Sequence, residues 1–91
     1  MSVAVVFDVP GMTEAQYDRV MRDLDSAGAS TPSGRLAHVA AELPGGWWVM
    51  DLWESPEQLE RFVPVLMPIL VGAGVTPPTP TILPVHRLEL V

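Results

Sequence analysis

The sequence predicts a single α+β domain, 1–91, in which strands and helices follow one another in the order βαββαβ. Two observations carry this prediction: four short runs rich in β-branched and aromatic residues, and two segments with the apolar spacing of helices. A third observation concerns assembly. The expected central strands are apolar on both faces, so we expect the sheet to pack against a second copy of the chain.

The first half of the chain contains a strand and a capped helix. The strand is expected over 3–9, where β-branched residues and phenylalanine precede a Pro-Gly pair. Thr13 and Gln16 have the spacing of a capping box, and Gly28 marks the end of the helix that they begin. The apolar stripe of this helix has the i, i+3, i+4, i+7 spacing and comprises Tyr17, Val20, Met21 and Leu24. We expect this stripe to face the sheet.

A polar loop over 30–34 leads into a predicted hairpin. Its strands are expected over 36–42 and 47–53, and a Pro-Gly-Gly turn joins them. Because strand side chains alternate between faces, Trp47 and Trp48 must point to opposite sides of the sheet. We expect one of them to lie at an interface and the other at a pocket or its rim.

The second helix begins at a capping serine, Ser55, which is followed by proline and by a glutamine that completes a capping box. Pro64 and Pro68 interrupt its apolar face. Each interior proline deletes a backbone hydrogen bond and costs about 3 kcal/mol, so we expect a kink or a split near Val63 and again near Met67. Such a helix would leave a gap for a small apolar ligand; alternatively, the prolines only end one helix and begin another.

The chain is expected to finish with a fourth strand. Glycines over 72–74 end the second helix, 76–84 is a proline-rich connector, and the strand is expected over 85–91. Two consecutive strand-helix-strand units predict a ferredoxin-like sheet with strand order 4-1-3-2 and both helices on one face. No helix covers the other face, although in 3–7 and 47–50 the residues that point to either face are apolar. We therefore expect a homodimer through the open sheet face.

Composition restricts the partners. The formal net charge is −6, from eleven acidic residues and five arginines. Phosphate-backbone or anionic-lipid binding needs a basic patch, so we expect neither a nucleic-acid nor a membrane partner. Cysteine is absent, which excludes a disulfide, a thiolate metal site and a cysteine nucleophile. The amino terminus lacks a signal-peptide pattern and no apolar run reaches spanning length, so a cytoplasmic location is expected.

The familiar catalytic motifs are missing. The chain has no glycine-rich phosphate loop, no Gly-x-Ser-x-Gly elbow and no His-Glu-x-x-His pair. Phosphoryl transfer, nucleotide cofactors and serine hydrolysis are therefore not expected. We expect any chemistry to proceed without a metal and without a bound cofactor.

Three segments resemble the dimeric α+β barrel superfamily and, within it, small proteins of the antibiotic biosynthesis monooxygenase type. They are 9–17, which follows the opening strand, 34–40 and 46–55. The last is the most specific, because a strand that ends in Trp-Glu-Ser and leads into a capped helix is frequent in that family. The resemblance covers nearly the whole chain. It implies that two sheets from two subunits form a barrel, and that each subunit keeps a pocket between its sheet and its own helices.

The resemblance implies a range of functions: cofactor-free oxygenation of aromatic polyketides, haem degradation, lactone isomerisation, cyclisation and plain ligand binding. The fold alone does not choose among them. The haem-degrading branch has an asparagine in the first strand and a histidine on the second helix, and this chain has neither. Only Trp53 matches that branch, so we do not expect haem as a ligand.

The candidates for acid–base chemistry are His38, Tyr17, Asp51 and His86. Histidine titrates near neutral pH, which suits a general acid or base. The two histidines lie on opposite edges of the expected sheet, about 14 Å apart, and would meet only through a dimer. Asp51 is expected in a central strand, where a carboxylate needs a partner such as Arg35, His38 or Arg87. For each of these residues a purely structural role is the alternative.

The candidates for binding an apolar or aromatic small molecule are Trp53, Trp48, Met21, Phe62 and Met67. The resemblance places Trp53 in the pocket, where its indole would stack on a flat ligand and its N–H would orient a carbonyl. The alternative is an ordinary core tryptophan. Met21, Phe62 and Met67 lie on helix stripes that face the sheet, where most side chains belong to the core.

The leading hypothesis is a small homodimeric enzyme that acts on an aromatic or polyketide-type molecule by a monooxygenase-like oxidation. The substrate itself would supply electrons to oxygen, while His38 or Tyr17 manages a proton. Two alternatives stay open: an isomerase or cyclase with a histidine base, and a non-catalytic small-ligand-binding domain.

Overall fold

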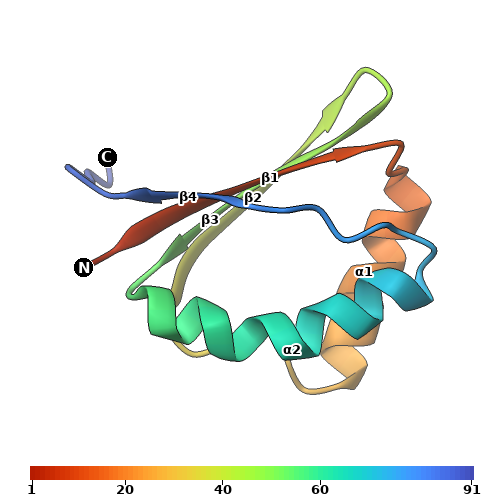
Figure 1. Cartoon of the computed structure of the whole chain (residues 1–91), viewed down its shortest axis with the longest axis horizontal. Helices are drawn as coiled ribbons and strands as arrows, with labels where there is room; N and C mark the ends of the chain where they lie inside the picture. The colour runs from red at the N-terminus through yellow and green to blue at the C-terminus, as the bar shows by residue number, and fades with distance from the viewer.

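A computed structural model describes residues 1–91 and shows a four-stranded antiparallel sheet with two helices on one face (Figure 1). The elements in chain order are β1 (Val3–Pro10), α1 (Glu14–Ser26), β2 (Arg35–Leu43), β3 (Gly46–Trp53), α2 (Pro56–Gly72) and β4 (Thr81–Pro84). The sheet order is β2-β3-β1-β4, which is the predicted order counted from the other edge. The expected βαββαβ, ferredoxin-like fold is confirmed.

The register of the sheet decides which side chains share a face. Val5 and Phe7 of β1 lie opposite Asp51 and Val49 of β3 and point toward the helices. We call this side the inner face. Residues of the other parity form the outer face, where Val6 lies opposite Met50. The two faces therefore carry different sets of residues.

Local capping fixes where both helices begin. The Thr13 side chain accepts a hydrogen bond from the Gln16 backbone N–H, and the Thr13 backbone N–H donates to the Gln16 side chain at 3.0 Å. The Ser55 side chain caps α2 by accepting a hydrogen bond from the Gln58 backbone N–H, while the Gln58 side chain accepts from the Ser55 hydroxyl and not from its backbone N–H, so the predicted capping box is only half formed. Both predicted helix starts are confirmed. Neither helix is long and apolar enough to cross a membrane.

The two prolines of α2 do not divide it. The helix is continuous from Pro56 to Gly72, so a split near Val63 or Met67, with the prolines ending one helix and beginning another, is wrong. The expected kink stays a prediction. Both prolines lie on the exposed side of α2, and so does Glu60, whose carbonyl loses its partner at Pro64. Water can solvate the freed carbonyls there, which removes most of the cost of the missing hydrogen bonds.

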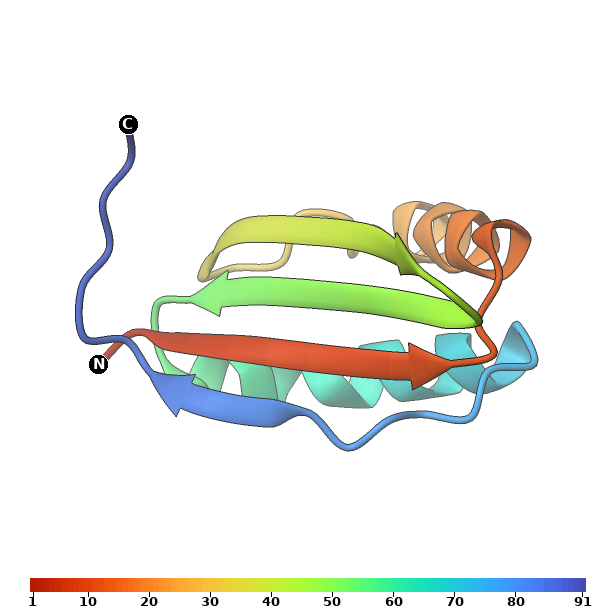
Figure 2. The same ribbon diagram turned by 90° about the horizontal axis from the view of Figure 1, so that it is seen from above.

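The last strand lies earlier than expected. β4 is Thr81–Pro84, and 85–91 forms no strand, so the predicted strand over 85–91 is wrong. The pairing explains the difference: Pro84 is already opposite Val3, the first residue of β1. The Val85 N–H still donates to the Ser2 carbonyl at 2.9 Å, and beyond that point the chain has passed the end of its neighbour. Figure 2 shows the terminal segment leaving the sheet.

Candidate active site

A mostly apolar cavity lies between the inner face and the two helices. Its volume is about 60 Å³, and eleven of its fifteen lining residues are hydrophobic. The polar or charged side chains that line it are those of Tyr17, Arg35, His38 and Asp51. A few polar groups in an apolar enclosure are the usual composition of a small-molecule site.

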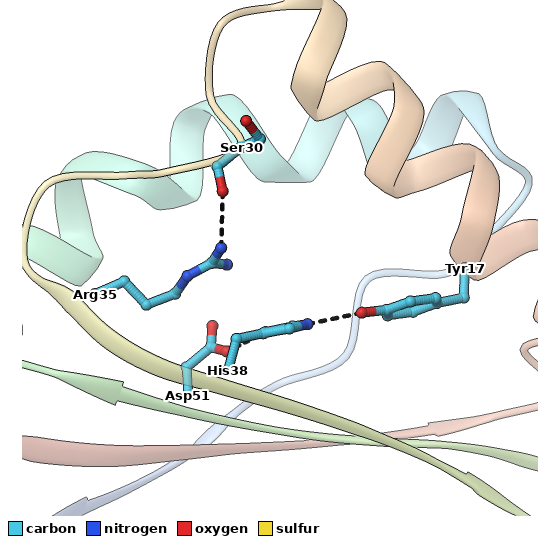
Figure 3. Close-up of polar contacts among 5 residues, drawn as sticks. All are labelled: Tyr17, Ser30, Arg35, His38 and Asp51. Atoms are coloured by element: carbon cyan, nitrogen blue, oxygen red, sulfur yellow. Dashed lines mark hydrogen bonds and ion pairs between the residues drawn. The ribbon is translucent and has the colours of Figure 1, made fainter.

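Three of these side chains form one hydrogen-bonded chain, which Figure 3 shows. The distance between His38 Nδ1 and Asp51 Oδ1 is 2.5 Å. On the other side of the ring, His38 Nε2 lies 2.7 Å from the Tyr17 hydroxyl oxygen. A carboxylate accepts only, so Nδ1 carries a proton; Nε2 of the neutral ring is then the acceptor, and Tyr17 donates to it.

Three different elements supply this chain. His38 on β2 lies directly opposite Asp51 on β3, and this register brings the imidazole and the carboxylate into contact. Tyr17 reaches them from α1, in the stripe that packs on the core. The Tyr17 ring is held by stacking on Trp47, with a centroid separation of 5.3 Å. The sheet therefore fixes the histidine and carboxylate, and α1 supplies the hydroxyl.

Burial governs the electrostatics of Tyr17. Desolvation raises the pKa of the Tyr17 hydroxyl above its ordinary value of 10.0. The positive charge of Arg35 acts in the opposite direction, while the carboxylates of Asp51 and Asp18 add to the increase. Tyr17 is therefore a neutral phenol near pH 7. It can donate one proton and accept another.

Asp51 has the partner that its position requires. It is a buried charged residue, with only 4% of its surface exposed, and His38 is its hydrogen-bond partner. Of the three partners expected, Arg35, His38 and Arg87, the structure selects the histidine. An unpaired carboxylate at this depth would be strongly destabilising, so the pair also serves the fold.

The residues predicted to bind a ligand divide between the two faces. Met21 and Phe62 line the cavity, and Met67 packs on the core without lining it. Trp48 lies on the outer face, opposite Asp8. His86 is also on the outer side, in a broad groove over the sheet, so the two histidines do not share a site within one chain.

Trp53 lies on the inner face but belongs to the core. Its side chain is fully buried and does not line the cavity. It packs against Phe62 with ring centroids 5.4 Å apart. Its indole N–H, like that of Trp47, is buried without a hydrogen-bond partner. Within one chain, Trp53 supports the cavity wall and does not form it.

Arg35 is the charged lining residue that sequence reasoning did not place in the site. A β-bulge separates Arg35 from Ala37: Arg35 pairs with Trp53, and Ala37 pairs with Leu52, the residue before Trp53 in β3. Residues 35 and 38 have opposite parity in a regular strand and would face opposite sides. The extra residue in the bulge places both on the inner face. The sequence carries no clear signal of this bulge.

No group of three or more His, Asp or Glu side chains has the proximity of a metal-ligand cluster. His38 Nδ1 and Asp51 Oδ1 are hydrogen-bonded to each other, so neither atom is free to bind a metal ion. The arrangement of the site is suited to moving a proton between a ligand in the cavity and the imidazole.

Several solved structures share this architecture. A candidate antibiotic biosynthesis monooxygenase from Chloroflexus aurantiacus J-10-fl is 21% identical, with a TM-score of 0.62 and 98% of each chain covered. Rv0793 from Mycobacterium tuberculosis is 18% identical, with a TM-score of 0.66 over 98% of this chain and 100% of that one. The chain has the fold of these proteins. The resemblance seen in the sequence is thus confirmed for the fold.

A further match is to a protein with a stated activity. SnoaB from Streptomyces nogalater, a cofactor-independent oxygenase whose structure was solved in a mutant form, is 12% identical, with a TM-score of 0.65. The match covers 96% of this chain and 93% of that chain. No protein-family model and no curated protein sequence matches the chain. The likeness is therefore one of fold, and the activity has to be argued from the site.

Proposed function

We propose that this protein is a cofactor-independent enzyme that removes a proton from an enolisable or phenolic aromatic molecule and oxidises the resulting anion with O₂. The observation that carries the proposal is the hydrogen-bonded chain Asp51–His38–Tyr17 at the wall of an apolar cavity. The fold shared with SnoaB, a cofactor-independent oxygenase, supports the same direction.

The proton transfer follows from the hydrogen bonds. A ligand hydroxyl next to Tyr17 gives its proton to the Tyr17 oxygen as the tyrosine's own proton passes to His38 Nε2. The products are a ligand oxyanion and an imidazolium, and Asp51 stabilises the imidazolium through Nδ1. The histidine is therefore the base, and the tyrosine is its contact with the ligand.

The oxidation balances without an added reductant. An anthrone, a tricyclic ketone with a CH₂ group that enolises, would lose the two hydrogens of that group and gain one oxygen atom as C=O. The second oxygen atom of O₂ leaves as water, and all four electrons come from the substrate. The protein's part is to form the electron-rich anion in an apolar cavity and to hold it there.

The cavity is too small for such a molecule unless its wall moves. Ligand sites usually have volumes of roughly 300–1,000 Å³, and this cavity has about 60 Å³. Phe62 also lines a second hollow of about 300 Å³ between the loop 28–33 and α2. We propose that a shift of Phe62 joins the two spaces and admits the ligand.

The outer face supports the proposal of a homodimer. A groove of about 810 Å³ runs over it, and nine of its twelve lining residues are hydrophobic. Leu36 and Leu83 are half exposed at this face, with 53% and 50% of their surface accessible. An exposed apolar sheet face of this kind is typical of an interface, and a second copy of the same sheet matches it in chemistry and extent.

Oxygen uptake with anthrone tests the proposed function. We expect uptake of one O₂ per anthraquinone formed and, with ¹⁸O₂, one labelled atom in the product. His38→Gln and Tyr17→Phe should each lower kcat/KM at least about 100-fold, whereas Arg22→Met, on the exposed side of α1, should leave it unchanged. Activity that survives both inner-face substitutions would overturn the proposed relay.

The same assay separates the alternatives. An isomerase or cyclase using His38 would convert a substrate of its own without consuming O₂, because its reaction involves no change in oxidation state. A ligand-binding domain would bind anthrone with no turnover, and its affinity would not depend on His38. The complete proton relay favours an enzyme over a binding domain, since binding alone does not need an oriented base.

A further inference from the structure

The guanidinium of Arg35 is the charged group of the cavity that the proton relay does not use. Arg35 opens β2, and the bulge that follows it directs the side chain over the inner face (Figure 3). The side chain lines the cavity together with Tyr17, His38 and Asp51. The bulge thus adds a permanent positive charge to a wall that otherwise has one carboxylate and one imidazole.

The hydrogen-bonding capacity of Arg35 is largely unused. One N–H, on Nη2, donates to the Ser30 carbonyl at 2.9 Å, and the side chain forms no other hydrogen bond. No carboxylate forms an ion pair with it. Its guanidinium carbon lies 6.0 Å from the centre of the Phe62 ring. Since a guanidinium has five N–H groups, several remain for a ligand.

The field of Arg35 reaches the hydroxyl at the end of the relay. Burial is the largest influence on Tyr17 and raises the pKa of its hydroxyl, but the charge of Arg35 lowers that pKa. An oxyanion beside the Tyr17 oxygen would experience the same stabilising field.

The net charge of the cavity wall and its ligand depends on whether the ligand enters neutral or already ionised. Before proton transfer, Arg35 and Asp51 carry opposite charges, and His38 and the ligand are neutral. After transfer, the imidazolium and the ligand oxyanion add one charge of each sign. A neutral ligand that ionises in place therefore keeps the wall neutral at every step. A ligand that is already a carboxylate, with His38 neutral, leaves one uncompensated negative charge.

We propose that Arg35 is an oxyanion-binding residue, and that the cavity selects neutral phenols or enols which it binds as their conjugate anions. This inference rests on the proposed function, because the anion held by Arg35 is the one that the relay creates. The ligand O–H bond breaks, its proton reaches His38 through Tyr17, and the oxygen is held between the Tyr17 hydroxyl and the guanidinium. Arg35 thereby lowers the pKa of the bound ligand.

4-Nitrophenol is a suitable probe because its anion, and not its neutral form, is yellow. Titrating the bound probe by absorbance gives its apparent pKa in the site. We expect this pKa to lie below that of the free phenol in the wild-type protein. We expect Arg35→Met to weaken binding of the anion about 10-fold or more, which is the usual loss when a hydrogen bond to a charged group is removed. Arg35→Lys should restore part of the effect.

Three controls make the experiment decisive. 4-Nitroanisole keeps the ring and the nitro group, but its methoxy group cannot ionise, so its affinity should be the same for the wild type and Arg35→Met. Arg22→Met removes a positive charge from the exposed side of α1, which is outside the cavity, and should change the affinity for neither ligand. Circular dichroism checks that each variant folds, and methionine keeps an apolar stem next to Phe62.

The outcomes separate the inference from the proposed function. If both probes bind and the pKa of bound nitrophenol is the same in the wild type and Arg35→Met, the role of Arg35 is overturned while the relay stands. If neither probe binds the wild-type protein, both the inference and the proposed function are overturned. A selective loss of nitrophenolate binding in Arg35→Met supports the inference.

Discussion

His38 and Asp51 occupy directly opposed positions on β2 and β3, and their side chains meet at 2.5 Å on the inner face of the sheet. No loop positions this pair, because both residues lie within hydrogen-bonded strands that hold their backbones in place. Their cross-strand register fixes the orientation of the imidazole, and the Nε2 atom is directed at the Tyr17 hydroxyl.

Asp51→Asn tests the orienting role of this carboxylate. The amide can present its N–H₂ group to Nδ1, which favours the wrong tautomer and removes the charge that stabilises an imidazolium. With anthrone as substrate, we expect kcat to fall about 100-fold or more and KM to change little. Oxygen uptake measures both quantities. Asp8→Asn, on an exposed residue of the outer face, is the matched control, and equal rates in the two variants would refute the role.

Tyr17 is the only tyrosine in the chain, so the change in tyrosinate absorbance with pH comes from this residue alone. Burial raises the pKa of its hydroxyl above 10.0 in the folded protein. We expect a titration of tyrosinate absorbance to have its midpoint above 10.0 in the native state and to return close to that value in denaturant. A native midpoint at or below the denatured one would show that the hydroxyl is not buried as described.

The same pKa shift gives a pH dependence of stability. Above pH 10 the unfolded chain loses the tyrosine proton while the folded chain still keeps it, so unfolding becomes more favourable as pH rises. The stabilisation by neutral Tyr17 is complete below pH 10 and is lost as pH rises through the folded pKa. Denaturant unfolding at several alkaline pH values should show this loss in the wild type. Tyr17→Phe should lack this component of the pH dependence.

Sequence reasoning predicted the sheet because its signals are local. β-branched runs, capping boxes and glycine turns each depend on a few neighbouring residues, and they gave five of the six elements close to their observed bounds. The partner of Asp51 was narrowed to three candidates by the cost of burying a carboxylate. Choosing His38 among them required the cross-strand register, which is a long-range property.

The features that sequence reasoning missed depend on contacts between distant segments. β4 ends at Pro84 because β1, its partner, begins at Val3, and nothing within 85–91 reveals this. Pro64 remains inside a continuous helix because its side of α2 faces solvent. Arg35 belongs to the site because the β-bulge shifts the alternation of side chains along β2, so that Arg35 and His38 point to the same face.

Phe62→Ala tests the wall between the cavity and the second hollow, which lies between the loop 28–33 and α2. Truncation should join the two spaces, so we expect the affinity for anthrone to rise relative to that for 4-nitrophenol. The loss of a buried ring should also lower the free energy of unfolding by about 3–5 kcal/mol. Fluorescence or calorimetric titration measures the ratio of affinities. Trp53→Phe disturbs the same core without lining the cavity and should leave the ratio unchanged.

The proposed homodimer is tested at Leu83. This residue is half exposed on the outer face of one chain, so Leu83→Glu leaves the monomer core intact. In a dimer through this face the carboxylate would be buried without a partner, and we expect dissociation to become at least about tenfold more favourable. Sedimentation velocity over a range of concentrations measures the effect. Val71→Glu adds the same charge on α2, at an apolar residue with 63% of its surface exposed, and should not change assembly. A wild-type protein that is monomeric at high micromolar concentration would refute the dimer, and the outer groove would then need a different occupant.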